Sequence, residues 1–211
     1  MKRGMLVALA FAGLATAAAA AWSSRIVERP QPAPIAAKPR PTWADKDRIF
    51  LTKAQLFQAH AEGAIDRDIQ SVLDVRKRMH YGDFVWNDRN VPKGPVWVRV
   101  DLKSQLISVF RSGHEIGTAV VLYGADEKQT PNGVLPVIAK IKDHKSATYD
   151  GAPMPYTLRL TQDGVAIHGS DVRWGAATHG CIGVPVEFAQ KLFGQVAKGD
   201  QVLIISDKRT A

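Results

Sequence analysis

The chain has 211 residues, of which 45% are hydrophobic, 23% charged and 8% aromatic, and this composition excludes disordered, collagen-like and repeat proteins. The net charge of +8 is unevenly distributed, because residues 1–42 carry six basic residues and one acidic residue, whereas residues 43–211 carry 22 basic and 19 acidic ones. Nucleic-acid binding needs basic side chains concentrated on the folded domain. We therefore expect no nucleic-acid partner.

The first 22 residues have the pattern of an export signal. Lys2 and Arg3 precede an uncharged apolar stretch at residues 5–22, and the alanines at 17–21 offer small-residue cleavage sites. The stretch is also long enough to stay in the inner membrane as an uncleaved signal anchor. Because the basic residues favour a cytoplasmic N-terminus, we expect the rest of the chain in the periplasm.

Residues 23–42 are predicted to form a linker. Five prolines lie between residues 30 and 41. Proline blocks helix and sheet pairing and favours an extended, semi-rigid spacer. This segment would hold the folded domain away from the membrane.

Residues 43–94 are predicted to form a helical extension. Thr52 and Gln55 form a capping-box pattern that starts a helix ending near Gly63. Asp66 is expected to cap a second helix, because apolar residues recur at helical spacing as far as Met79. The two helices would pack on the main domain or bind substrate, and periodicity alone favours packing.

From residue 96 onward the pattern is typical of strands. Apolar residues alternate with polar ones, and turn signals separate the segments. A helix is expected from Pro185 to Gly199. The expected fold is mostly β (α+β), a sandwich or barrel. The predicted strands span residues 96–102, 106–110, 116–122, 134–141, 156–160, 165–168 and 202–205.

Reactive residue types concentrate in residues 166–184. Cys181 is the only cysteine, which excludes an intrachain disulfide and a multi-thiolate zinc site and leaves packing, redox chemistry or nucleophilic catalysis. A free thiol with a pKa of about 8.5 needs an imidazole or a helix N-terminus nearby to act as a nucleophile. His168 ends a predicted strand and the predicted helix follows Cys181, so both aids are expected.

The motifs around these two residues resemble those of one family. His168-Gly169 and the later Thr-His-Gly-Cys-Ile at residues 178–182 are similar to the catalytic motif of the L,D-transpeptidases, the YkuD-domain family. Residues 130–133, 152–156 and 164–169 resemble further family motifs, so the resemblance covers about residues 95–206. It implies a YkuD-like β-sandwich with a helix after the nucleophile, and a catalytic domain over residues 95–207.

The resemblance also implies residue roles. Cys181 would be the nucleophile and His168 the base, with the backbone of Gly169 or Ser170 orienting the imidazole. The loop before the nucleophile would support the oxyanion through the backbone of His179 and Gly180. The residues expected to contact substrate are Tyr156, Arg159, Arg173 and Trp174.

One position departs from the family pattern. The family commonly has Arg two residues after the nucleophile, where this chain has Gly183. The change removes a bidentate partner for a carboxylate. Arg159 or Arg173 is the expected substitute.

The implied reaction is acyl transfer on peptidoglycan stem peptides. The thiolate would attack the carbonyl between residue three of a stem tetrapeptide and its terminal D-Ala, expel D-Ala and leave a thioester. The acceptor stays open: a diamino-acid amine would give a cross-link, a lipoprotein lysine an anchored protein, and water a carboxypeptidase. The family reaction requires neither a metal nor another cofactor.

Two other functions compete with this one. A zinc-dependent hydrolase would use His168, His179 and Cys181, with His144 as a further ligand, although these residues lack a recognised ligand spacing. A noncatalytic peptidoglycan-binding module that has kept the fold is the other alternative, and Gly183 motivates it.

Overall fold

The computed structural model describes residues 46–61, 67–124, 129–147, 150–173, 176 and 178–206. The predicted signal at residues 1–22 and linker at residues 23–42 lie outside these residues. Within the described part of the chain, no helix is long and apolar enough to cross a membrane.

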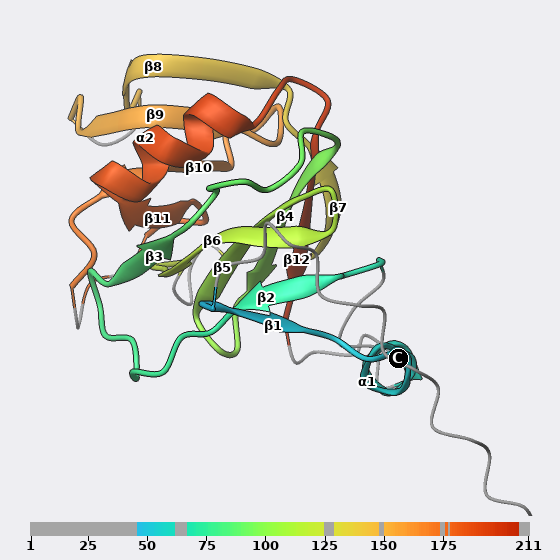
Figure 1. Ribbon diagram of the computed structural model, residues 1–211. Coiled ribbons are helices and arrows are strands. Elements are labelled where there is room, and N and C mark those ends of the chain that lie inside the picture. Colours follow the sequence, from blue (N-terminus) through green and yellow to red (C-terminus); the bar gives the residue numbers. More distant parts are fainter. Residues whose placement is uncertain are drawn as a thin grey trace, which may run out of the picture. The chain divides into compact units, whose positions relative to one another are not determined.

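An eight-stranded sheet, sheet A, forms one layer of the fold (Figure 1). Its strand order is β1-β2-β6-β5-β4-β12-β7, and β3 also pairs with β6. Most neighbours are antiparallel, but β12 runs parallel to β4 and β2 runs parallel to β6. The strands are β1 (Arg48–Phe50), β2 (Ser71–Leu73), β3 (Phe84–Trp86), β4 (Val96–Asp101), β5 (Leu106–Arg111), β6 (His114–Val120), β7 (Gly133–Pro136) and β12 (Gln201–Ile205).

A four-stranded sheet, sheet B, and one helix complete the domain. The strand order is β11-β10-β9-β8, in which only the β10 and β11 pair is parallel. Helix α2 (Val186–Gln195) follows β11 directly, and its buried face carries Phe188, Ala189 and Leu192. The strands are β8 (Ala139–Lys145), β9 (Pro153–Arg159), β10 (Ala166–Ser170) and β11 (Ile182–Pro185).

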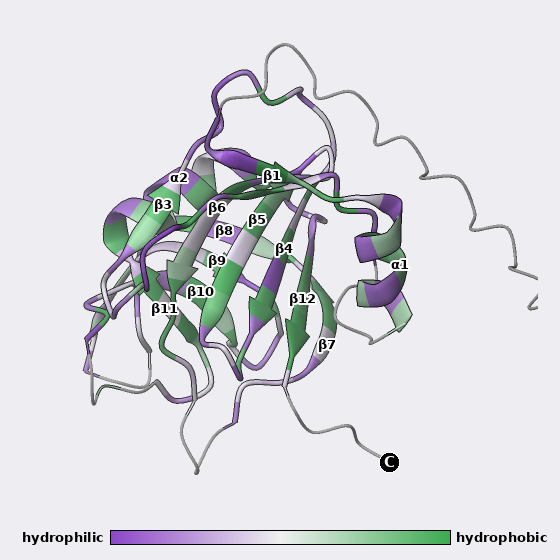
Figure 2. Cartoon of the chain, turned by 60° about the horizontal axis from the view of Figure 1, so that its bottom comes forward, coloured by the Kyte–Doolittle hydropathy of each residue, from purple (hydrophilic) through white to green (hydrophobic). Residues whose placement is uncertain are grey.

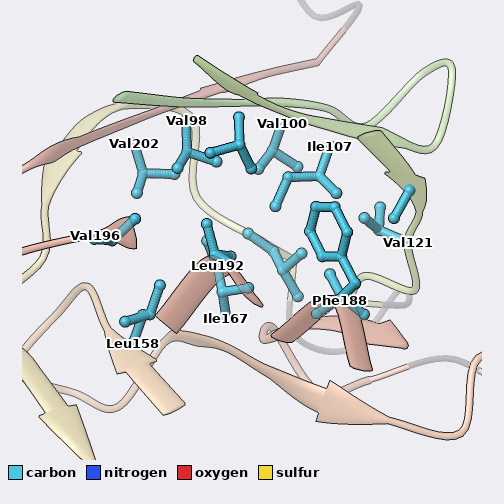
Figure 3. Close-up of a cluster of buried hydrophobic side chains, with 14 of the residues drawn as sticks. Val98, Val100, Ile107, Val121, Leu158, Ile167, Phe188, Leu192, Val196 and Val202 are labelled. Atoms are coloured by element: carbon cyan, nitrogen blue, oxygen red, sulfur yellow. The ribbon is translucent and has the colours of Figure 1, made fainter. Parts of the chain in front are cut away.

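Side chains from both sheets and from α2 meet in one hydrophobic core (Figure 3). Phe188 is fully buried and packs edge-on against Trp86, with ring centroids 5.5 Å apart. The strand alternation predicted from the sequence supplies the inward-facing residues of both sheets. The mostly β (α+β) fold is therefore confirmed. Core residues labelled in Figure 3 include Val98, Val100, Ile107, Leu158, Ile167, Leu192 and Val202.

Two predicted segments differ from the structure in this region. The single strand expected at residues 134–141 is two strands in different sheets, because the chain leaves β7 at Pro136 and enters β8 at Ala139. Between Cys181 and helix α2 lies a short strand, β11, that the sequence did not predict. The helix begins after Pro185 as expected.

The first predicted helix of the extension is confirmed as α1 (Lys53–Ala61). The capping box forms as predicted: the Thr52 amide donates to Gln55 Oε1 at 2.9 Å, and the Gln55 amide donates to Thr52 Oγ1 at 3.3 Å. The helix has no buried residue, and Figure 2 shows hydrophilic and hydrophobic residues alternating along it. Its predicted end at Gly63 lies outside the described residues.

The second predicted helix, over residues 66–79, is wrong. Residues 71–73 form strand β2, which pairs with β1 along its length and with His114 of β6 through Ser71. Ser71 and Leu73 are buried while Val72 between them is only partly so, an alternation that suits a strand. Tertiary pairing therefore overrides the local helical spacing. Asp66, the expected cap, lies outside the described residues.

The extension packs on the outer face of sheet A. Ile69 forms a small buried cluster with Trp97 and Phe110, whose rings stack with centroids 4.3 Å apart. The guanidinium of Arg67 lies over Trp97, 5.2 Å from the ring centroid. Strands β1, β2 and β3 thus join the main sheet, whereas the sequence predicted two helices packed on the domain.

Candidate active site

Parallel pairing of β10 and β11 brings His168 and the start of the nucleophile loop together. Ile167 is paired with Ile182, and both are fully buried in the core. His168 is paired with Gly183, two residues after Cys181. Because successive side chains of a strand point to opposite faces, His168 and Cys181 belong to the face of sheet B turned away from that core. The structure therefore pairs the strand that carries His168 with the residues that directly follow Cys181.

The imidazole of His168 is held as one tautomer. The ring is 9% exposed, and its Nδ1 lies 2.9 Å from the carbonyl oxygen of Gly169. A carbonyl can only accept, so Nδ1 carries the hydrogen and the neutral ring keeps a lone pair on Nε2. Of the two backbone groups expected to orient the ring, Gly169 makes this bond.

The electrostatics of the site favour a neutral His168. Burial lowers the pKa of His168 below its ordinary value, and the charge of His144 lowers it further. The hydrogen bond to Gly169 acts in the opposite direction and raises the pKa. A neutral imidazole with a free Nε2 is the form that can accept a proton from a thiol.

Cys181 is partly exposed on a tight turn. Gly180 before it has φ +100°, a conformation that a residue with a Cβ rarely adopts. The thiol Sγ lies 3.7 Å from the Gly164 carbonyl oxygen and donates to it. A carbonyl accepts from a thiol and not from a thiolate, so this contact favours the protonated sulfur.

The helix N-terminus expected beside the thiol lies elsewhere. The four residues of β11 separate Cys181 from the first turn of α2, which corresponds to about 13 Å of extended chain. The start of α2 instead lies beside Gly169, since a Cβ built on Gly169 would be 3.3 Å from Val186 Cα. Helix α2 thus begins beside the residue that follows His168.

A segment that sequence analysis missed flanks the nucleophile loop. Leu122 and Gly183 exchange two backbone hydrogen bonds, each 2.9 Å long. The Thr178 amide donates to the Tyr123 carbonyl at 3.1 Å. Residues 122–124 therefore contact the loop on both sides of Cys181. The predicted strand over residues 116–122 includes Leu122, but no local pattern indicates that this segment pairs with a distant part of the chain.

Gly183 is tightly packed in this structure. A Cβ at this position would lie 3.1 Å from Ser170 Cβ and 3.5 Å from Leu122 Cβ. The space beside the backbone, where the family commonly has an Arg side chain, is therefore occupied by Ser170 and Leu122. Neither of these two neighbours is a cation.

The residues expected to contact substrate differ in their surroundings. Tyr156 is partly buried, has φ +56° and packs edge-on against Phe193 of α2, with ring centroids 5.8 Å apart. Arg159 Nε donates to the Thr161 carbonyl at 3.1 Å, which ties its guanidinium to the turn before β10. Arg173 is exposed, and its Nη1 lies 3.4 Å from an Asp171 carboxylate oxygen. Trp174 lies outside the described residues.

The remaining predicted site residues lie on or next to the loop. His179 is exposed and Gly180 buried. Ser170 ends β10, paired with Pro185. Among the described residues, no group of three or more His, Cys, Asp or Glu side chains could hold a metal ion, so the zinc-hydrolase alternative gains no support from His144, His168, His179 and Cys181.

A cavity of about 860 Å³ lies away from this site. Residues of the extension between Val72 and Tyr81 form one wall, and strands β5 and β6 form the other. Glu115 and Thr118 line it, but Cys181 and His168 do not. The cavity is therefore lined by neither of the two predicted catalytic residues.

Comparisons with known proteins identify one family. A family model described as the L,D-transpeptidase catalytic domain, YkuD, matches residues 95–204. The chain is similar to the solved L,D-transpeptidase of Enterococcus faecium, with 28% identity and a TM-score of 0.48 over 54% of this chain and 50% of that one. It is also similar to an L,D-transpeptidase from Stackebrandtia nassauensis, with 24% identity and a TM-score of 0.49 over 57% of this chain and 60% of that one. The chain thus spans less than two thirds of the length of each of these solved proteins. A comparison with curated protein sequences gave no match.

Proposed function

This chain belongs to the YkuD family of L,D-transpeptidase catalytic domains, and from this premise we propose that it is an exported cysteine L,D-transpeptidase acting on peptidoglycan stem peptides. The observation that carries the proposal is the fixed imidazole of His168 on a strand that pairs with the residues after Cys181. Its Nδ1–H is bound by Gly169, which leaves Nε2 to accept the thiol proton. The predicted export signal supports a location in the periplasm.

The first half of the reaction forms a thioester. The thiol leaves the Gly164 carbonyl, transfers its proton to His168 Nε2 and attacks the carbonyl carbon between stem residue three and the terminal D-Ala. The carbonyl oxygen takes the negative charge, and the backbone amides of residues 179–181 would stabilise it, where the chain turns at Gly180 with φ +100°. His168 then returns the proton to the departing D-Ala amine, and the C–N bond breaks.

The second half transfers the acyl group. An acceptor amine attacks the thioester while His168 takes its proton, and the Cys181 sulfur leaves and is reprotonated. A stem diamino-acid amine yields a cross-link between stems, and a protein lysine anchors a lipoprotein. Water yields the tripeptide of a carboxypeptidase.

Cys181→Ala provides the direct test. We expect the purified protein to release D-Ala from stem tetrapeptides and to form L,D-linked or tripeptide products by mass spectrometry. Cys181→Ala should form none, because no other residue can carry the thioester. A carbapenem should add one acyl group per wild-type chain, because the strained lactam carbonyl is an acyl donor that stays on the sulfur.

The competing noncatalytic module predicts a different result. Its support is Gly183, whose packing against Ser170 leaves the family's arginine position without a cation. Wild-type protein that binds peptidoglycan, releases no D-Ala and takes up no carbapenem would favour this module and contradict the transpeptidase. Loss of activity on chelation would favour the zinc hydrolase.

A further inference from the structure

Residues 122–124, which we call the clamp segment, hold the nucleophile loop from both ends. Leu122 pairs with Gly183 after the nucleophile, and Tyr123 accepts from the Thr178 amide before it. Thr178 in turn donates its hydroxyl to the Cys181 carbonyl. A displacement of the clamp segment would therefore move the backbone that carries the sulfur.

Thr130 fixes the far end of the clamp segment. Its Oγ1 accepts a hydrogen bond from the Gly124 amide at 3.0 Å. Thr130 is 6% exposed and Gly124 is also buried, so water cannot easily replace this bond. An amide left unpaired in such a position is unstable, and the backbone shifts to satisfy it.

Thr130 is itself anchored through the turn that it begins. Asn132 Nδ2 donates to Ser206 Oγ at 2.8 Å, next to the end of β12. Gly133 then enters β7 and pairs with Ile204 of β12. The hydroxyl thus connects sheet A to the loop that carries Cys181, although the Thr-Pro-Asn-Gly sequence by itself indicates only a turn.

We propose that Thr130 is a positioning residue for Cys181, acting through Gly124, the clamp segment and Thr178. This inference rests on the proposed function. Acyl transfer is sensitive to the position of the attacking atom, since a misplacement of about 1 Å costs on the order of 10²-fold in rate. Loss of the Thr130 hydroxyl should therefore slow the attack by sulfur without removing any group that touches the substrate.

The test compares three variants of the full chain. Thr130→Val keeps the side-chain shape and removes the hydroxyl, whereas Thr130→Ser keeps the hydroxyl. Ser71→Ala is the matched control, because it removes a different buried hydroxyl, one that bonds His114 Nδ1 at 2.9 Å where β2 pairs with β6. The readouts are the limiting acylation rate and the half-saturating concentration with a carbapenem, together with the free energy of unfolding in urea.

We expect Thr130→Val to lower the limiting acylation rate about tenfold or more with little change in half-saturation. Thr130→Ser should stay within about twofold of wild type, and Ser71→Ala should lose stability but not rate. A wild-type rate for Thr130→Val would overturn the proposal. So would equal slowing by Thr130→Ser, or by Ser71→Ala at matched stability.

The two proposals fail in distinguishable ways. Wild-type protein that takes up no carbapenem contradicts the transpeptidase itself. The positioning role is then measured by alkylation of Cys181 with iodoacetamide across pH. An unchanged alkylation profile in Thr130→Val contradicts that role, and a changed profile rescued by Thr130→Ser supports it.

Discussion

His114 and His168 are both buried histidines whose pKa burial lowers, but their partners differ. His114 is 4% exposed on β6, with Nδ1 2.9 Å from Ser71 Oγ, and the charge of Arg48 lowers its pKa further. His168 is 9% exposed, with Nδ1 on a backbone carbonyl. A hydroxyl can donate or accept, so it leaves either tautomer of His114 open, whereas a carbonyl fixes that of His168.

The comparison shows that burial and a hydrogen bond do not make a histidine a base. The region of His114 even adjoins the cavity of about 860 Å³ that Glu115 lines. What distinguishes His168 is the parallel strand β11, which places the loop of the only cysteine on the same face. The two histidines therefore differ in the strands that pair with theirs. This difference predicts how substitutions in each region affect turnover and stability.

The largest expected difference comes from the same substitution at each histidine. His168→Ala should lower turnover by about 10²- to 10⁴-fold, because the thiol loses its base. His114→Ala should retain turnover but lower the free energy of unfolding by about 1–3 kcal/mol, since it leaves the buried Ser71 hydroxyl unpaired. Product formation and urea unfolding measure the two effects. Equal losses of turnover would abolish the distinction between the histidines.

A smaller difference is expected at the crowded glycine of each region. A Cβ on Gly117 of β6 would lie 2.3 Å from the Trp86 ring, whereas one on Gly183 would lie 3.1 Å from Ser170 Cβ. Gly117→Ala should therefore destabilise the protein by about 1–3 kcal/mol, and Gly183→Ala by less. Thermal and urea unfolding test the order. Greater destabilisation by Gly183→Ala would show that Ser170 is held more rigidly than its side chain suggests.

The smallest expected effect is on the pH dependence of the reaction. Protonated His168 cannot act as a base, so the rate should fall as pH drops through its pKa, which lies below the ordinary value of 6.5. His144→Gln removes the charge that lowers this pKa in addition to burial, and the acid limb should then move upward. Profiles of kcat/KM against pH for wild type and for His144→Gln give the position of the acid limb in each protein. An acid limb above 6.5 in wild type would contradict a neutral His168.

The free energy of unfolding should depend on pH through the same two histidines. The unfolded chain binds more protons than the folded one between each lowered pKa and 6.5, so stability is lost as pH falls through that window. Glu115 acts with the opposite sign, because burial raises its pKa and its stabilising effect is lost as pH rises above the ordinary 4.5.

Much of the fold could be predicted from the sequence because the signals are local. The alternation over residues 96–102 and the capping box at Thr52 each depend on neighbours in the chain, and both appear in the structure. The helix expected over residues 66–79 failed because pairing with β1 and β6 decides the conformation of Ser71 to Leu73. Such pairing leaves no periodic signal in the segment itself.

The candidate site likewise has a part that the sequence predicts and a part that it does not. His168 and Cys181 are visible in the motif, and so is the turn at Gly180. The bond between Thr130 and Gly124 and the pairing of Leu122 with Gly183 are not, because they join segments brought together only by the two sheets. The predicted substrate contacts at Tyr156 and Arg159 show the same limit, since their packing partners come from α2 and the turn before β10.

Strands β2 and β3 cover one side of β6, and Ile69 covers Trp97 and Phe110. A shortened chain beginning at residue 95 would expose both that row of backbone N–H and C=O groups and an aromatic patch. Open strand edges recruit other chains, and large apolar patches promote aggregation. Preparations of the catalytic region for crystallography or inhibitor screening should therefore retain the residues from Asp47 onward to avoid self-association.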